Sequence, residues 1–290
     1  MSNKFLKSLF PPFFLIKLFR LRSYVQFLKF KKLVSKNVKL KDIHKGERCF
    51  LLGSGPSIKK ENLLPLKNEI VFALNNFYVH EDFAEIMSGN KPKYYITSPI
   101  HPPQTDDEWK RWFKEMEFKT PKQVNMLFGI NAYKRNIKYI FDKYEIFKKH
   151  KINWYFPGIY ISELYSFSNI DIDLSRMILQ GRTCSIYALI IAIYMGFDEI
   201  YLLGMDHNNF MYKEKEMRFY KNAIHQKDEV KRVFKKESYN RRSFQSLSET
   251  FALYEIFKKL DVSIKNLSNI STIDIFEKDT LSNILHKHDN

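Results

Sequence analysis

Short apolar runs that stop at a small or amide residue constrain the fold of this chain more than any other feature. Residues 48–52 (RCFLL), 69–74 (EIVFAL) and 93–97 (KYYIT) are such runs, and glycine, asparagine and serine follow them in turn. Continuous apolar runs of this length, bounded by turn residues, are typical of strands that are buried on both faces. The pattern predicts a parallel sheet whose strand ends carry small polar side chains.

Three later runs extend this pattern toward the C-terminus. Residues 152–156 (INWYF) and 199–203 (EIYLL) predict two more strands, and residues 264–267 predict the last one. Residues 157–175 have too mixed a pattern for an assignment.

Helical patterns separate the predicted strands. Residues 185–195 (SIYALIIAIYM) are apolar nearly all round, with Thr183 placed as an N-cap and Gly196 at the C-cap position, so we expect a buried helix. Residues 246–260 read as an amphipathic helix.

The polar stretch between residues 102 and 150 is predicted to be covering structure. Trp109, Trp112 and Phe113 are spaced as one face of a helix, and a basic helical stretch follows at residues 133–149.

Because strands and helices alternate, the fold class predicted is α/β, with a mostly parallel, doubly wound, Rossmann-like sheet and right-handed crossovers. At 290 residues and 44% hydrophobic content, the chain can bury one main core. Cys49 and Cys184 lack metal-site spacing, which indicates a reducing compartment without structural zinc.

The first 45 residues form a basic, aromatic arm ahead of the predicted domain, residues 46–290. The formal net charge is +16, and no acidic residue precedes Asp42. Seven phenylalanines lie among the basic residues of this arm. The basic residues that precede Asp42 are Lys4, Lys7, Lys17, Arg20, Arg22, Lys29, Lys31, Lys32, Lys36, Lys39 and Lys41.

Two interpretations of this arm stand side by side. It could lie on an anionic membrane surface through residues 1–40, or its aromatics could pack on the domain while the lysines face water. Nucleic-acid binding is disfavoured. The apolar run at residues 9–19 is too short for a transmembrane helix and is broken by proline, and no signal peptide is predicted, so we expect a cytoplasmic protein, peripheral on the membrane in the first interpretation.

The turn at residues 53–57 (GSGPS) is the first candidate for ligand binding. Glycines allow a close backbone approach, and exposed amides with two serine hydroxyls could hold phosphate or ribose oxygens. The motif is neither GxGxxG nor a Walker A loop, and a plain connection is the alternative. The residues proposed to bind are Gly53, Ser54, Gly55 and Ser57.

Other strand ends add polar groups at the same predicted edge of the sheet. Asn75 and Asn76 could read a base or ribose, with an Asx turn as the alternative. Ser98 could bind a ribose or sugar hydroxyl. A second helix N-terminus is predicted at the same edge by Thr183, Cys184 and Ser185.

An acid and an imidazole follow the strand at residues 199–203. A histidine beside an aspartate is a credible general base, so Asp206 and His207 are the candidate catalytic pair. The alternatives are a surface histidine and an aspartate that only fixes the turn by hydrogen bonds.

Three segments resemble the family 42 bacterial sialyltransferases in order and spacing: GSGPSI at residues 53–58, NNFY at 75–78, and RTCSIYALIIAIYMGFDEIYLLGMD at 182–206. The resemblance covers roughly residues 48–267. It implies one nucleotide-binding domain with a lid, and a CMP-activated nonulosonic donor used without a metal. By position, the residues after the first three strands would contact the nucleotide, and residues 183–185 would line the donor carboxylate.

Two positions depart from the resemblance. Asn208 stands where the family has a tyrosine, and Phe244 stands at about the position of the family's base histidine. Tyr212 would stand in for a second tyrosine that supports the leaving phosphate, and His207 would replace the base.

The expected function is therefore inverting, metal-independent glycosyl transfer to a cell-surface glycan or lipid-linked acceptor, with no cofactor beside the CMP-sugar substrate. A lid is expected at about residues 207–245, whose basic part could instead be a solvated loop. The alternatives are an ATP-dependent pyrophosphokinase, because the glycine turn also resembles archaeal-type pterin pyrophosphokinases and motility-associated factors, and a non-catalytic nucleotide-binding protein on the membrane. A homo-oligomer stays open.

Overall fold

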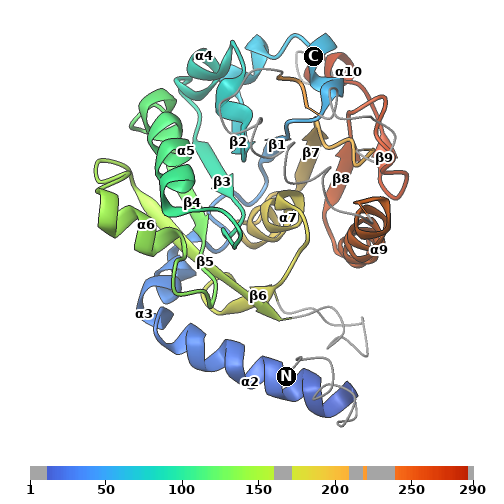
Figure 1. The fold of residues 1–290 in the computed structure, drawn as a ribbon. Coiled ribbons are helices and arrows are strands. Elements are labelled where there is room, and N and C mark those ends of the chain that lie inside the picture. The colour runs from blue at the N-terminus through green and yellow to red at the C-terminus, as the bar shows by residue number, and fades with distance from the viewer. Residues whose placement is uncertain (1–11, 160–171, 209–217, 221–238, 287–290) are drawn as a thin grey trace.

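A nine-stranded parallel sheet forms the centre of the computed structural model, which describes residues 12–159, 172–208, 218–220 and 239–286 (Figure 1). Neighbouring strands all pair in parallel, in the spatial order β6-β5-β4-β3-β2-β1-β7-β8-β9. The strands are β1 (Arg48–Leu52), β2 (Ile70–Leu74), β3 (Lys93–Thr97), β4 (Asn125–Gly129), β5 (Ile152–Ile159), β6 (Met177–Leu179), β7 (Glu199–Leu203), β8 (Ser263–Asn266) and β9 (Glu277–Lys278).

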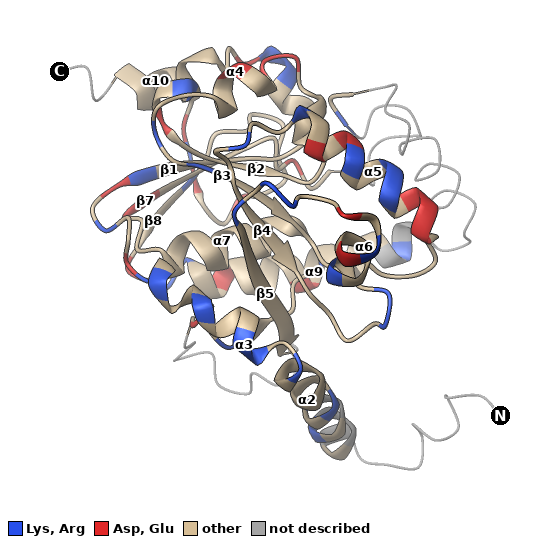
Figure 2. Ribbon diagram, turned by 90° about the vertical axis from the view of Figure 1, so that its left-hand side faces the viewer, with Lys and Arg blue, Asp and Glu red and all other residues tan. Residues whose placement is uncertain are grey.

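Helices cover both faces of this sheet, and each face has its own apolar core. Along β1, Cys49 and Leu51 point into one core and Phe50 and Leu52 into the other, as the two-residue period of a strand requires. Figure 2 shows α5 and α7 on opposite sides of the sheet. The helices are α2 (Pro12–Leu28), α3 (Lys31–Val34), α4 (Phe83–Met87), α5 (Asp106–Lys119), α6 (Ile137–Tyr144), α7 (Cys184–Tyr194), α9 (Tyr239–Phe257) and α10 (Leu281–His286).

The predicted doubly wound α/β fold is confirmed, and its strand order reverses between β1 and β7. From β1 the chain builds the sheet outward to β6, then returns to place β7 on the other side of β1. Leu52 and Leu203 are register partners at the carboxyl ends of these two strands. A reversal of this kind is where open parallel sheets bind their ligands.

Helix α7 forms as its sequence predicts. It is apolar all round because it is buried between the sheet and other helices, with Leu189 and Ile191 fully inaccessible. Thr183 occupies the N-cap position, and Gly196 follows the last turn with a φ of 84°, a left-handed conformation that favours glycine.

Three strands were not predicted. β4 lies inside the polar stretch that was interpreted as covering structure only, β6 has three residues, and β9 is a glutamate and a lysine without apolar alternation. The last long helix also begins earlier than predicted, at Tyr239, and ends at Phe257.

The second half of the predicted arm belongs to the folded body. Phe27 and Val34 are buried in a small cluster with Ile130 and Phe156. Asn37, which is fully buried, donates from Nδ2 to the carbonyl oxygens of Trp154 (2.7 Å) and Leu174 (3.1 Å). The packing alternative therefore holds from Phe27 onward, whereas much of α2 stays exposed. Among the described helices, none combines the length and apolar character needed to cross a bilayer.

Candidate functional site

Two adjoining clefts open at the carboxyl ends of the strands around the reversal point. The smaller has a volume of about 320 Å³ and the larger about 660 Å³, and Ser54, Asn75 and Ser98 line both. The smaller cleft brings together ten residues that the sequence predicted for the site: Gly53, Ser54, Gly55, Asn75, Ser98, Thr183, Cys184, Ser185, Asp206 and His207.

The turns after β1 and β7 are fastened to one another at the floor of the smaller cleft. The Gly53 amide donates to the Leu203 carbonyl oxygen at 2.8 Å, and the Gly55 amide to the Gly204 carbonyl oxygen at 2.7 Å. A Cβ on Gly53 would lie 2.4 Å from the Gly204 oxygen, and one on Gly55 would lie 2.7 Å from it. Glycine is required here because two backbones approach within contact distance.

Asp206 braces these two turns. Its Oδ2 accepts from the Ser57 amide at 2.9 Å, and its Oδ1 accepts from the Ser57 hydroxyl at 2.5 Å. Burial raises the pKa of the Asp206 carboxyl, while the Ser57 hydrogen bonds oppose that shift. Both carboxylate oxygens are therefore engaged in fixing the turn, which is the alternative that the sequence left open.

The way in which the glycine turn can bind a ligand needs a correction. We expected exposed amides, but those of Gly53, Gly55 and Ser57 donate to the last residue of β7 and to the turn that follows it, because β1 and β7 continue to pair beyond their ends. Ser57 also faces Asp206 through its hydroxyl. Ser54 lines both clefts, so it is the turn residue best placed to contact a ligand.

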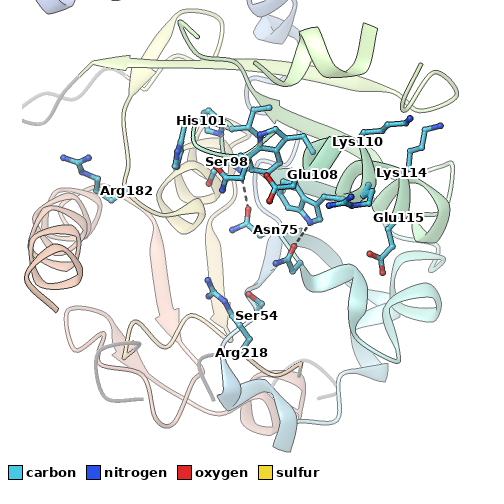
Figure 3. Close-up of a pocket in the computed structure, with 17 residues that line it drawn as sticks. Ser54, Asn75, Ser98, His101, Glu108, Lys110, Lys114, Glu115, Arg182 and Arg218 are labelled. Carbon is cyan, nitrogen blue, oxygen red and sulfur yellow. Dashed lines mark hydrogen bonds between the residues drawn. The ribbon is translucent and has the colours of Figure 1, made fainter. Parts of the chain in front are cut away.

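The two asparagines after β2 have different surroundings. Asn75 adopts a φ of 50°, lines both clefts, and accepts weakly from the Ser98 amide at 3.5 Å (Figure 3). Asn76 is buried, accepts from Trp112 Nε1 at 2.7 Å and donates to the Tyr220 hydroxyl at 2.5 Å. Asn75 is thus available to a ligand, whereas Asn76 links α5 to residues 218–220.

The N-terminus of α7 faces the smaller cleft through Thr183, Cys184 and Ser185. Within the described chain, the Thr183 side chain makes no capping bond to the first turn of α7, and its hydroxyl lies 2.7 Å from that of Ser185. An uncapped helix N-terminus carries a partial positive charge and favours an anion. Burial raises the pKa of Cys184 to about 12, so its thiol is a neutral part of the wall.

His207 joins this wall through a chain of hydroxyl groups. Its Nε2 lies 2.8 Å from the Tyr254 hydroxyl, which lies 2.6 Å from Ser185 Oγ. Tyr254 is fully buried on α9. Burial lowers the pKa of His207 to about 4, and the positive charge of Arg218 acts in the same direction, so the imidazole is neutral near pH 7.

Two arginines that the sequence reasoning did not single out line both clefts. Arg182 forms a two-point ion pair with Glu249, with Nε–Oε2 and Nη2–Oε1 distances of 2.5 and 3.0 Å. This pairing lowers the pKa of Glu249. Arg182 directly precedes Thr183, so its position beside a predicted helix N-terminus could have indicated that it belongs to the site. Arg218 reaches the clefts from residues 218–220.

Aromatic and basic side chains of α5 form one side of the larger cleft (Figure 3). The Trp109 and Trp112 rings pack with centroids 5.2 Å apart. Lys110 and Lys114 line the same cleft, together with the exposed His101. The helix that was expected only to cover the sheet therefore contributes to the site.

The remaining predicted site features lie elsewhere. Tyr212 and most of the expected lid, residues 209–217 and 221–238, lie outside the described residues. Asn208 is buried and donates from Nδ2 to the Ile270 carbonyl oxygen at 3.1 Å, and Phe244 is exposed on α9. Across the described parts of the chain, no group of three His, Cys, Asp or Glu side chains is placed to hold a metal ion.

Comparisons with known proteins give a likeness in structure. No protein-family model matches the chain, and no curated protein matches it either. A solved structure of the sialyltransferase CstII from Campylobacter jejuni, in complex with the substrate analogue cytidine-5'-monophosphate, matches over 81% of this chain and 85% of that chain. The sequence identity is 18% and the TM-score 0.40, an extent of likeness that assigns neither a ligand nor a reaction.

Proposed function

We propose that this protein is a glycosyltransferase that moves a nonulosonic sugar from a CMP-activated donor to an acceptor hydroxyl. One observation carries the proposal: the smaller cleft joins an uncapped helix N-terminus, a neutral histidine and residues from the turns after β1, β2, β3 and β7. Such a donor carries a phosphate and a carboxylate, so it needs a cleft that favours negative charge.

The donor would lie across the reversal point of the sheet. The first turn of α7 favours its anionic groups. Arg182, which is paired with Glu249, lines the cleft beside this turn. Asn75 and Ser54 offer an amide and a hydroxyl to the nucleoside. The fastened glycine turn contributes a fixed surface against which the nucleotide packs.

The acceptor would occupy the larger cleft, which shares Ser54, Asn75 and Ser98 with the smaller one. Trp109 and Trp112 line this cleft, are half-buried, and offer aromatic surface suited to the apolar face of a sugar ring. An acceptor hydroxyl held there would approach the donor from the side of the shared residues.

The transfer would be a single displacement. A bond forms between the acceptor oxygen and the anomeric carbon, the bond from that carbon to the phosphate oxygen breaks, and CMP leaves with the electron pair. The acceptor proton would pass to His207 Nδ1, which requires that Nε2–H donates to the Tyr254 oxygen. An anionic donor beside the imidazole would raise its pKa from the low resting value and strengthen it as a base.

The test combines a ligand panel with paired histidine variants. We expect CMP to raise the thermal midpoint more than UDP, GDP or ATP does, and a CMP-activated nonulosonic sugar to turn over in EDTA. His207→Gln should keep the CMP shift while turnover falls about 100-fold or more, the scale of a lost general base. The matched control is His286→Gln, at an exposed position on α10 that lines neither cleft, which should retain turnover.

Other outcomes assign the alternatives. Stabilisation by ATP with magnesium-dependent diphosphate transfer would identify a pyrophosphokinase, and CMP binding without turnover would identify a non-catalytic nucleotide-binding protein. Full turnover in His207→Gln, or an equal loss in His286→Gln, would remove His207 as the base. The proposal fails altogether if no nucleotide stabilises the protein.

A further inference from the structure

An exposed apolar stripe runs along the whole length of α2. Five side chains recur at alternating intervals of four and three residues, which places them on one face of a helix. They are between 47% and 59% exposed. The stripe consists of Phe14, Leu18, Leu21, Val25 and Leu28.

This stripe faces away from the body of the protein. The attachment of α2 lies on the opposite side of the helix, where the buried Phe27 packs edge-on against Phe156 with ring centroids 5.7 Å apart. Figure 2 shows α2 extending outward beyond β5. The apolar face is thus presented to the surroundings rather than to the core.

Basic side chains flank the stripe. Lys17 and Arg22, one on each side of the stripe, are exposed, and so are Lys29, Lys31 and Lys32 directly after α2. Figure 2 shows basic and no acidic positions along α2. The charged side chains along α2 beside the stripe are therefore all positive.

The charge around the stripe distinguishes between the two surfaces that it could contact, a second copy of α2 and an anionic bilayer. Its four-three spacing would suit a second copy of α2, but the flanking positions that would then face each other include Lys17, Arg22 and Lys29, which repel. An anionic bilayer can bind both the apolar stripe and the basic side chains, because apolar side chains enter the acyl boundary while lysine and arginine reach the headgroups.

We propose that α2 docks in the plane of an anionic lipid surface through this stripe. A further cleft of about 560 Å³ supports the placement, since its lining runs from Arg22 and Ser23 on α2 to Ser98 and Arg182 at the site. If the proposed glycosyl transfer holds, the docked protein would present this cleft to a lipid-linked acceptor. Membrane docking itself does not depend on that reaction.

Vesicle flotation of the full chain tests the docking directly. The wild type should bind vesicles of phosphatidylglycerol and phosphatidylcholine, bind pure phosphatidylcholine weakly, and be released by salt. The triple variant Leu18→Ser, Leu21→Ser, Val25→Ser should lose binding about tenfold or more, because it removes the centre of the stripe. These side chains are exposed, so the fold should survive.

A matched triple variant controls for a general loss of surface hydrophobicity. Phe118→Ser, Phe244→Ser, Ile270→Ser removes three exposed apolar side chains that lie outside the arm, and it should bind vesicles as the wild type does. Equal loss in both variants would overturn the proposal, and so would equal binding of the wild type to neutral and anionic vesicles. A dimer in light scattering that the stripe variant abolishes, without vesicle binding, would assign the face to a second copy instead. CMP-induced stabilisation, measured on the same variants, reports on the proposed function separately.

Discussion

The two walls of the smaller cleft are built in different ways. The wall formed by the turns after β1 and β7 is held by backbone bonds and by glycines in contact with the opposite backbone. The wall formed by α7 and α9 is held by side-chain hydroxyls, from Thr183 through Ser185 and Tyr254 to His207.

The turn wall therefore determines the shape of the cleft, and the helix wall determines its protonation and charge. A backbone wall tolerates no added atom, because its neighbours cannot rotate away, so it fixes the form of the cleft. A hydroxyl chain can lose one member while the helices stay packed, so that wall can tune protonation and charge. Substitutions on the turn wall should accordingly lower the free energy of unfolding. Substitutions on the helix wall should change how that free energy depends on pH.

The largest effect is expected from Gly55→Ala on the turn wall. Gly55 has a φ of −69°, so alanine suits its backbone, but the new Cβ would lie 2.5 Å from Asp206 Oδ2 and 2.7 Å from the Gly204 oxygen. We expect the free energy of unfolding, measured in urea, to fall by about 3 kcal/mol, and CMP stabilisation to disappear.

Gly46→Ala is the matched control for this substitution. Gly46 has a φ of 81°, and no described heavy atom beyond its chain neighbours lies within 4 Å of the place that an added Cβ would take. It should cost about 1 kcal/mol from backbone strain alone. If Gly55→Ala proved no more costly than Gly46→Ala, the contact between the two turns would not determine the shape of the cleft.

On the helix wall we expect a loss of folding stability at low pH, of similar or smaller size. The pKa of His207 is about 4 in the folded protein, and an unfolded histidine titrates near 6.5. Between these values the unfolded chain binds the extra proton, so stability present above pH about 6.5 is lost as the pH falls toward 4, by up to about 3 kcal/mol.

His207→Gln should remove this part of the pH dependence. Glutamine does not titrate and can still hydrogen-bond to the Tyr254 hydroxyl. Urea unfolding of both proteins at several pH values from 4 to 8 gives the comparison, and the difference between their stabilities should shrink toward low pH. A variant whose stability falls with pH as steeply as that of the wild type would show that His207 is not held neutral by burial.

The sequence predicted the backbone of the turn wall better than its hydrogen bonds. β1, β3 and β7 match the predicted runs residue for residue, because continuous apolar strands buried on both faces leave a clear signal. Parallel strands end at one edge, and Ser54, Asn75 and Ser98, which follow three of them, line the same cleft. Sequence spacing could not reveal whether a given amide points to a ligand or, as at Gly55, to the neighbouring turn.

The helix wall was predicted less completely for a different reason. The N-terminus of α7 was found from local sequence, but Tyr254 lies 47 residues beyond His207 and meets it only through the packing of α9. Trp112 likewise reaches the larger cleft from a helix that was expected only to cover the sheet. Arg218 lies within the segment expected to be a lid, but the sequence could not show which of its basic side chains would line the clefts. Contacts that depend on tertiary packing leave no periodic trace in a single chain.

The smallest expected effect compares two serines of the same turn. Ser57→Ala removes the hydroxyl donor to Asp206 and leaves a buried carboxylate oxygen with one bond fewer, so the free energy of unfolding should fall by about 1–2 kcal/mol. Ser54→Ala, at a hydroxyl that lines both clefts, should leave that free energy within about 0.5 kcal/mol while CMP affinity falls several-fold. Calorimetric titration with CMP and urea unfolding of both variants decide the matter. The opposite pattern, with Ser54 supporting stability and Ser57 supporting affinity, would mean that the turn meets the nucleotide through the face that here contacts Asp206, and that the brace opens when the ligand binds.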